Sequence, residues 1–118
     1  MQRRVLLRIS IAVFALANIF VWVVVWWPRS HVLTVSFLDV GQGDAILIEG
    51  PTGFQMLIDG GRDRSVLSEL GKRMSPFDRS LDIVVETHPD ADHIGGLPSV
   101  FERYMVRTFM GPGIPNDT

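Results

Sequence analysis

The amino-acid sequence predicts an α/β domain preceded by one transmembrane helix. Two observations support this prediction. An uncharged apolar run covers residues 9–27, and the chain beyond it alternates between strand patterns and helical stripes. The predicted division is residues 1–28 for the N-terminus and the transmembrane helix, and residues 32–118 for the domain.

The apolar run has the length of a membrane span. A helix over residues 9–27 is roughly 28 Å long, close to the roughly 30 Å hydrocarbon core of a bilayer. Three tryptophans gather toward one end of it, as in an interfacial belt: Trp22, Trp26 and Trp27. Pro28 then ends the helix. A cleaved signal peptide and a buried core helix are the alternatives. The most apolar part of the run follows the Ala-Leu-Ala of residues 15–17, which favours an anchor over a cleavage site.

The arginines around the run predict its orientation. Arg3, Arg4 and Arg8 precede it, whereas Arg29 alone follows closely. The positive-inside rule therefore places the N-terminus in the cytoplasm and the domain outside, in a single-pass protein of the cell membrane. His31, just beyond the span, is expected to be solvated.

Charge and cysteine content exclude some functions. The chain has no cysteine, so thiolate-bound zinc, disulfides and a cysteine nucleophile are excluded. Three of the 11 basic residues precede the span while all 13 acidic residues follow it, which leaves the rest of the chain with a net charge of −5. Such an acidic domain argues against autonomous DNA binding, although divalent cations would neutralise part of this charge.

An antiparallel meander opens the domain. Leu33, Val35 and Phe37 alternate with polar residues, as in a strand with one buried face. Residues 44–49 predict a second strand, and after the turn Pro-Thr-Gly at residues 51–53 the chain returns over residues 55–59.

Helices and further strands follow. Ser65 or Asp63 can cap a helix that reaches about Met74 and carries one apolar stripe: Val66, Leu67, Leu70 and Met74. Residues 81–87 form a strand whose consecutive Ile83, Val84 and Val85 suggest cover on both faces. A next helix has Leu97, Phe101 and Tyr104 on one face, residues 106–110 form a last strand, and residues 111–118 form a loop.

The chemistry of the chain is concentrated between residues 87 and 96, which read THPDADHIGG. Four poor core residues follow an apolar strand there: His88, Asp90, Asp92 and His93. Pro89 favours an extended backbone, in which residues two apart point the same way, so His88 and Asp90 should converge. Gly95 and Gly96 permit a tight turn, and Pro98 suits the first position of a helix.

These side chains predict a divalent metal site. Neutral imidazoles and ionised carboxylates are metal ligands at neutral pH, and the loop offers two of each. One ion fits this set, and a second would need ligands from elsewhere. Asp90 makes the set harder, so manganese or magnesium competes better with zinc than at a site of histidines alone. A calcium-like or empty acidic loop is the alternative.

The loop also resembles a known family. HPDADH is similar to the HxHxDH signature of the metallo-β-lactamase fold, with Asp90 where the signature has its second histidine. Together with FLDVGQGDAILIEG at residues 37–50 and LIDGG at residues 57–61, it resembles the metallo-β-lactamase-like domain of ComEC-type DNA-internalisation proteins. The likeness covers about residues 33–110. It implies the N-terminal half of an αββα sandwich.

The resemblance also implies roles for the site residues. His88 and Asp90 would bind one ion, Asp92 and His93 another, and Asp92 would orient the attacking water as the catalytic residue. Zinc or manganese, as one ion or two, would be the cofactor. The glycine loops at residues 40–44 and 59–61 would lie on the rim of the site, with Asp44 and Asp59 supporting the ligands from behind. Asp39 more often just closes a turn.

Three functions remain open. The first is a metal-dependent hydrolase of the nuclease type, which the resemblance associates with DNA uptake. The second is a membrane-tethered hydrolase of another phosphoester or ester, and the third is a non-catalytic fragment. No histidine follows His93, and Glu102 and Asp117 are the only acids beyond it. We therefore expect a truncated domain that is inactive as these 118 residues alone. A second chain or a missing segment would complete it.

Overall fold

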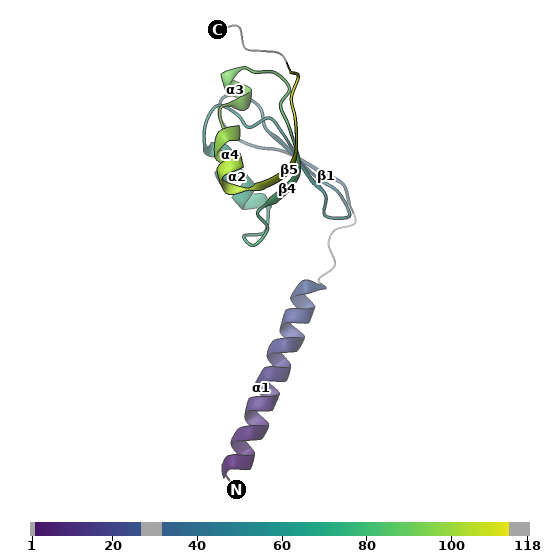
Figure 1. Cartoon of the computed structure of the whole chain (residues 1–118). Helices are drawn as coiled ribbons and strands as arrows, with labels where there is room; N and C mark the ends of the chain where they lie inside the picture. The colour runs from purple at the N-terminus through teal and green to yellow at the C-terminus, as the bar shows by residue number, and fades with distance from the viewer. Residues whose placement is uncertain (1, 27–31, 114–118) are drawn as a thin grey trace.

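The computed structural model describes residues 2–26 and 32–113, which form a long N-terminal helix followed by a five-stranded sheet with helices (Figure 1). The helices are α1 (Gln2–Val25), α2 (Ser65–Arg73), α3 (Ala91–Ile94) and α4 (Leu97–Arg103). The strands are β1 (Thr34–Phe37), β2 (Ile46–Glu49), β3 (Gln55–Ile58), β4 (Ser80–Val85) and β5 (Met105–Met110). The expected α/β architecture with a preceding apolar helix is confirmed.

Helix α1 is long and apolar enough to cross a membrane, and the domain buries none of its residues. A signal sequence near an N-terminus meets the same criterion of length and composition. The helix starts earlier than expected from the apolar run alone. Its two polar side chains bond within the helix, because Ser10 and Asn18 donate to carbonyls four residues back at 3.0 Å each. Such bonds reduce the cost of polar groups in hydrocarbon. Trp27, Pro28 and His31 lie outside the described residues.

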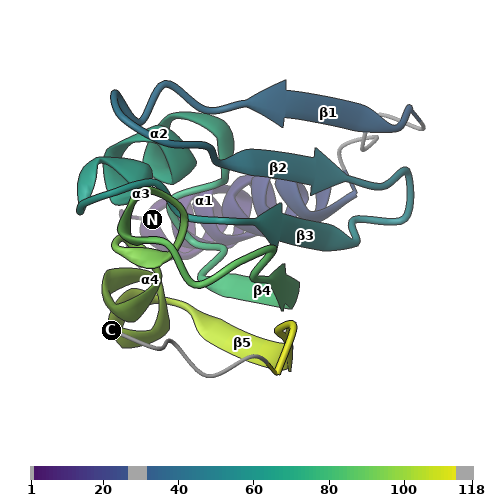
Figure 2. The same cartoon turned by 90° about the horizontal axis from the view of Figure 1, so that it is seen from above.

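The sheet has the order β1-β2-β3-β4-β5 (Figure 2). The first three strands are antiparallel, which confirms the meander, and the β2–β3 turn closes through the bond from the Gly50 N–H to the Phe54 carbonyl at 2.7 Å. Strands β3, β4 and β5 are parallel, because α2 and then α3 and α4 carry the chain back between them. The carboxyl ends of β3 and β4 therefore lie at the same edge of the sheet.

The core lies between one face of the sheet and the helices α2 and α4. The sheet contributes four residues that are less than 2% exposed: Leu47, Leu57, Leu81 and Val84. Val66 and Leu70 of α2 and Val100 of α4 meet them, and Leu67 packs at the margin. The predicted stripe of α2 is thus confirmed as core.

The predicted burial of β1 is wrong. Ser36 is its buried residue, and its hydroxyl accepts a hydrogen bond from Arg73 at 3.0 Å. Val35 and Phe37 are instead exposed, and the Phe37 side chain keeps 76% of its surface. The reason is that α2 and α4 both cover the Ser36 side of the sheet (Figure 1). Alternation predicts two faces of a strand, but the helices decide which face is covered.

The apolar side of β1 continues across the sheet as an uncovered surface. We call it the outer face, and the strand registers define it as Val35, Phe37, Ile46, Ile48, Met56, Ile58, Ile83, Val85 and Met110. Ile83 and Val85 are only half-buried there, so the expected cover on both faces of β4 is absent among the described residues.

In α4, Val100 is buried in place of Phe101, whose ring meets the Phe109 ring edge to face at 5.5 Å between centroids. Burial raises the pKa of the Tyr104 phenol at the end of α4.

Candidate metal centre

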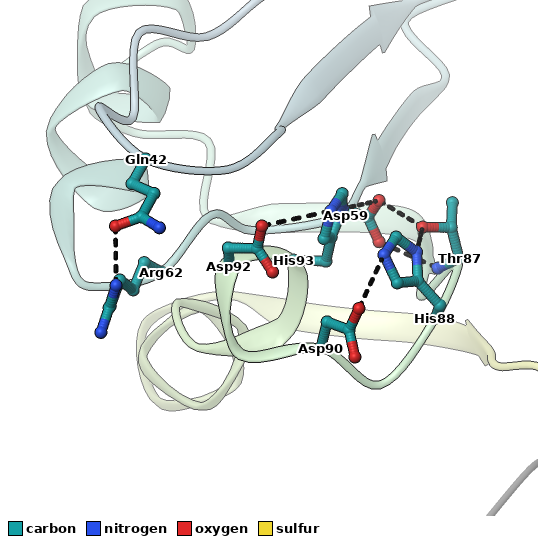
Figure 3. A network of polar contacts seen from close by, with 8 residues as sticks. All are labelled: Gln42, Asp59, Arg62, Thr87, His88, Asp90, Asp92 and His93. Carbon is teal, nitrogen blue, oxygen red and sulfur yellow. Dashed lines mark hydrogen bonds and ion pairs between the residues drawn. The ribbon is translucent and has the colours of Figure 1, made fainter. Parts of the chain in front are cut away.

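The histidines and aspartates of the HPDADH segment come together beyond the carboxyl end of β4 (Figure 3). The His88 and His93 rings lie 3.8 Å apart between centroids. His88 Nε2 lies 3.4 Å from Asp90 Oδ2, and His93 Nε2 lies 3.7 Å from an Asp92 carboxylate oxygen. The expected convergence of His88 and Asp90 is therefore seen in the structure, and the second pair forms where the chain turns into α3.

Asp59 supports this arrangement through hydrogen bonds to Thr87 and His93. It follows β3, has φ at +58° and is only 3% exposed. Its carboxylate accepts hydrogen bonds from the Thr87 backbone N–H at 2.9 Å and the Thr87 hydroxyl at 2.6 Å, and it lies 3.1 Å from His93 Nδ1. A non-glycine residue at positive φ is uncommon and costs energy, and three hydrogen bonds to one carboxylate offset that cost.

These bonds assign the tautomers of both histidines. An ionised carboxylate only accepts, so His93 Nδ1 carries the proton that it shares with Asp59. The Thr87 hydroxyl gives its one proton to Asp59 and therefore accepts from His88 Nδ1 at 2.9 Å. Each imidazole is left with an Nε2 lone pair.

Both lone pairs point at carboxylates, which are also acceptors. A nitrogen lone pair and a carboxylate oxygen at 3.4 or 3.7 Å attract only when something positive lies between them. Two ligands of one zinc ion, each bound at about 2.0–2.2 Å, are separated by roughly this distance. The donor set thus fits a divalent cation in chemistry.

The number of ligands is too small for a complete metal site. Among residues 2–26 and 32–113, no group of three or more histidine, aspartate or glutamate side chains is arranged to hold one ion. The donors instead form two separate pairs, His88 with Asp90 and Asp92 with His93. Metal binding by these four residues stays a prediction.

Glycines allow the surrounding loops to close on α3. A Cβ on Gly43 would lie 1.6 Å from the Asp92 carbonyl oxygen, and Gly43 also has φ at +98°. The loop of residues 40–44 therefore approaches the site, as predicted. Gly95 and Gly96 form the predicted turn between α3 and α4, with ordinary helical dihedrals rather than positive φ. Their role is close approach, because a Cβ on either would lie 2.0–2.1 Å from a carbonyl oxygen of the loop at residues 60–62. Pro98 is the second residue of α4 rather than the first.

The two rim loops are tied to each other. Arg62 Nη1 donates to the Gln42 side-chain carbonyl at 2.6 Å, and the Gly61 N–H donates to the Asp44 carbonyl at 2.9 Å. Asp44 thus contributes its backbone carbonyl, while its side chain is exposed. A supporting role for the Asp44 side chain stays a prediction. At the start of α2, the Ser65 N–H bonds the Asp63 carboxylate and lowers the pKa of that group.

Two contributions to the site were not predicted from the sequence. Thr87 precedes the first histidine, and its hydroxyl connects His88 to Asp59, 28 positions earlier in the chain. The Gln42–Arg62 contact joins the rims of two loops. Nothing local to these residues signals a role, since each depends on partners that only the fold brings near.

This geometry defines a class of protein: an α/β domain with a histidine and aspartate centre at the carboxyl ends of its parallel strands. A family model for the metallo-beta-lactamase superfamily matches residues 38–116, which is more than half of the chain. The chain belongs to that superfamily, and its mixed sheet is consistent with a partial fold of this kind. Members generally bind divalent metals such as zinc. A search of curated proteins found no match.

Proposed function

We propose that this chain is a membrane-anchored hydrolase domain that works with a divalent metal ion. One observation carries the proposal, namely that Asp59 and Thr87 orient both histidines so that each Nε2 lone pair meets a carboxylate. This orientation supports a cation at His88, Asp90, Asp92 and His93. A divalent ion there would supply Lewis acidity, which activates water at neutral pH and offsets the charge that develops on a phosphoryl or carbonyl oxygen.

The chain's own residues then have distinct tasks. The half-exposed carboxylate of Asp92 would accept a hydrogen bond from the attacking water and so orient it. Asp59 keeps His93 in the tautomer whose Nε2 is free to bind. The Gly43 backbone lies against Asp92 and limits the movement of that turn.

A second chain or a further segment would complete the site. The paired donors supply too few ligands for two ions, and the outer face carries apolar side chains that no described element covers. A layer packed on that face would exclude water from it and would bring additional ligands to the same edge of the sheet.

For the substrate, we propose a phosphodiester such as a DNA strand, as in the ComEC-type proteins that the three motifs resemble. The net charge of −5 beyond the membrane helix opposes tight autonomous DNA binding, so a partner or bound cations would have to offset it. A different phosphoester or a carboxylic ester is the alternative, and competing substrates offered to the domain together with its completing partner distinguish the two.

Metal binding is the first test. The full-length chain in detergent is titrated calorimetrically with Mn²⁺ and Zn²⁺, beside the double variant His88→Ala/His93→Ala. We expect the double variant to lose most of the binding because both neutral nitrogen donors are gone. His31→Ala is the matched control, since it removes the remaining histidine of the chain. Unchanged affinity in the double variant would contradict the proposal.

Activity is the second test. With Mn²⁺, the 118-residue chain alone is expected to cleave neither DNA nor a small phosphodiester, because the donor pairs lack further ligands. Metal-dependent turnover by this chain that disappears in Asp92→Ala would show that the described residues suffice. The proposed completion by a partner would then be wrong, while the proposed hydrolase function would stand.

A further inference from the structure

The two ends of the sheet differ in character. The candidate metal centre lies at the carboxyl ends of β3 and β4. The opposite end holds the start of β1, the β2–β3 turn and the loop of residues 74–79 that leads into β4 (Figure 1). Thr34 pairs with Glu49 there, directly before the turn. Helix α1 is therefore joined to the domain at the end farthest from the metal centre.

Exposed apolar side chains gather at this end of the domain. We call them the proximal patch, and they are Val32, Leu33, Phe54 and Phe77. Phe77 is 95% exposed, although it belongs to a well-bonded turn. The Asp78 N–H donates to the Ser75 carbonyl at 2.9 Å, and the Asp78 carboxylate accepts from the Ser80 hydroxyl at 2.9 Å. An ordered turn thus presents a fully exposed phenylalanine, which is costly in water.

Two members of the patch line one hollow. Val32 and Phe77 line the same hollow of about 700 Å³, together with Gly53 of the β2–β3 turn. Residues from the start of β1, the hairpin turn and the loop before β4 therefore face one common space. A flat apolar partner could meet all three segments at once.

Two exposed arginines lie on one side of the patch. Arg79 and Arg103 are exposed and line a second hollow of about 240 Å³ beside Pro76, on the other side of the same loop. Acids also lie at this end: Asp82 pairs with Arg107 at 3.2 Å, Asp78 accepts from the Ser80 hydroxyl, and Glu49 lines the larger hollow. The two exposed arginines beside Pro76 are the groups at this end that can meet anionic headgroups.

The connection to α1 is short. Eight residues lie between Val25, where α1 ends, and Thr34, where β1 begins. Even fully extended, a segment of this length spans at most roughly 30 Å. The proximal patch is consequently confined near whatever surface α1 enters.

We propose that the proximal patch docks on the surface of the lipid bilayer, with Phe77 and Phe54 in the interfacial layer and Arg79 and Arg103 beside anionic headgroups. The proposal rests on the membrane anchoring proposed above. Docking orients the domain so that the candidate metal centre faces away from the membrane, one strand length of roughly 20 Å from the lipid. A substrate would reach the centre from the aqueous side.

Site-directed labelling tests the docking. The chain has no cysteine, so one introduced cysteine accepts an environment-sensitive fluorophore at a single position. Full-length Phe77→Cys, Phe54→Cys and Gln42→Cys are labelled in vesicles of phosphatidylcholine and phosphatidylglycerol. Gln42 is the control because it is exposed on the rim of the metal centre. We expect the probes at positions 77 and 54 to be quenched by nitroxide lipids and shielded from iodide, and the probe at position 42 to behave in the opposite way.

A second variant tests the role of Phe77 itself. With the probe at position 54, Phe77→Asp should abolish most of the lipid quenching. Phe37→Asp should leave the quenching unchanged, because Phe37 is comparably exposed but ends β1 at the other end of the sheet.

The outcomes separate docking from anchoring. Equal iodide access at all three positions, in chains that still float with the vesicles, would overturn the docking alone, as would unchanged quenching in Phe77→Asp. Failure of the chain to float after carbonate extraction would overturn the anchoring, and the docking with it.

Discussion

At the scale of single residues, Asp59 sets the geometry of the candidate metal centre. We predict that Asp59→Asn lowers Mn²⁺ or Zn²⁺ affinity by about 10- to 100-fold, since an amide has one acceptor oxygen and cannot accept from the Thr87 N–H, the Thr87 hydroxyl and His93 together as the two carboxylate oxygens do. Titration calorimetry measures the change. Asp63→Asn is the control, because the amide oxygen can still accept from the Ser65 N–H and Asp63 lies outside the network. Equal losses of metal affinity in both variants would show that Asp59 has no special role in the metal centre.

Gly43 is the second residue on which the site depends. A Cβ there would meet the Asp92 carbonyl oxygen at 1.6 Å, so the loop must shift in Gly43→Ala. We expect a loss of about 2 kcal/mol or more in the free energy of unfolding, followed by thermal denaturation in detergent. Gly41→Ala is the matched control, because Gly41 also has positive φ but has nothing within 4 Å. A similar loss in both variants would attribute the effect to the backbone dihedral rather than to the close approach.

At the scale of elements, the sheet has one covered and one uncovered face. Leu47 points into the core with no exposed surface, so Leu47→Ala should cost about 2–5 kcal/mol of unfolding free energy. Phe37 on the outer face is exposed, and Phe37→Ser should change the unfolding free energy by no more than about 0.5 kcal/mol. Denaturant titration compares them.

The unfolding free energy of Phe37→Ser also tests whether a partner covers the outer face. In the purified chain, a large loss in Phe37→Ser would mean that another copy already covers this face. If the loss appears only in the presence of a completing chain, the outer face is the surface that the partner occupies. An unchanged outcome in both cases would argue against the proposed cover.

At the scale of the whole molecule, α1 and the arginines in its first turns predict the topology. We expect protease added to intact spheroplasts to remove a C-terminal tag and to spare an N-terminal tag, because Arg3, Arg4 and Arg8 favour the cytoplasmic side. A cytosolic marker protein controls for lysis. Protection of the C-terminal tag together with loss of the N-terminal tag would reverse the orientation, and loss of the N-terminal segment from the mature chain would identify a signal sequence.

The sequence by itself determined the features that depend on neighbours along the chain. Helix α1 follows from an uncharged run, the β2–β3 turn from Pro51 and Gly53, and the buried stripe of α2 from its helical spacing. The grouping of His88, Asp90, Asp92 and His93 is also local, because all four lie within six positions. Periodicity and turn chemistry act over a few residues, so they can be recognised without a structure.

Only the tertiary structure decided the rest. Which face of β1 is buried depends on α2, so Ser36 lies inside while Val35 and Phe37 face out. The need for Gly95 depends on a carbonyl of the loop after β3. The tautomers of the two histidines depend on Asp59, which is 34 positions from His93. Each of these features arises from contacts between segments distant in the chain, whose energies no local pattern encodes.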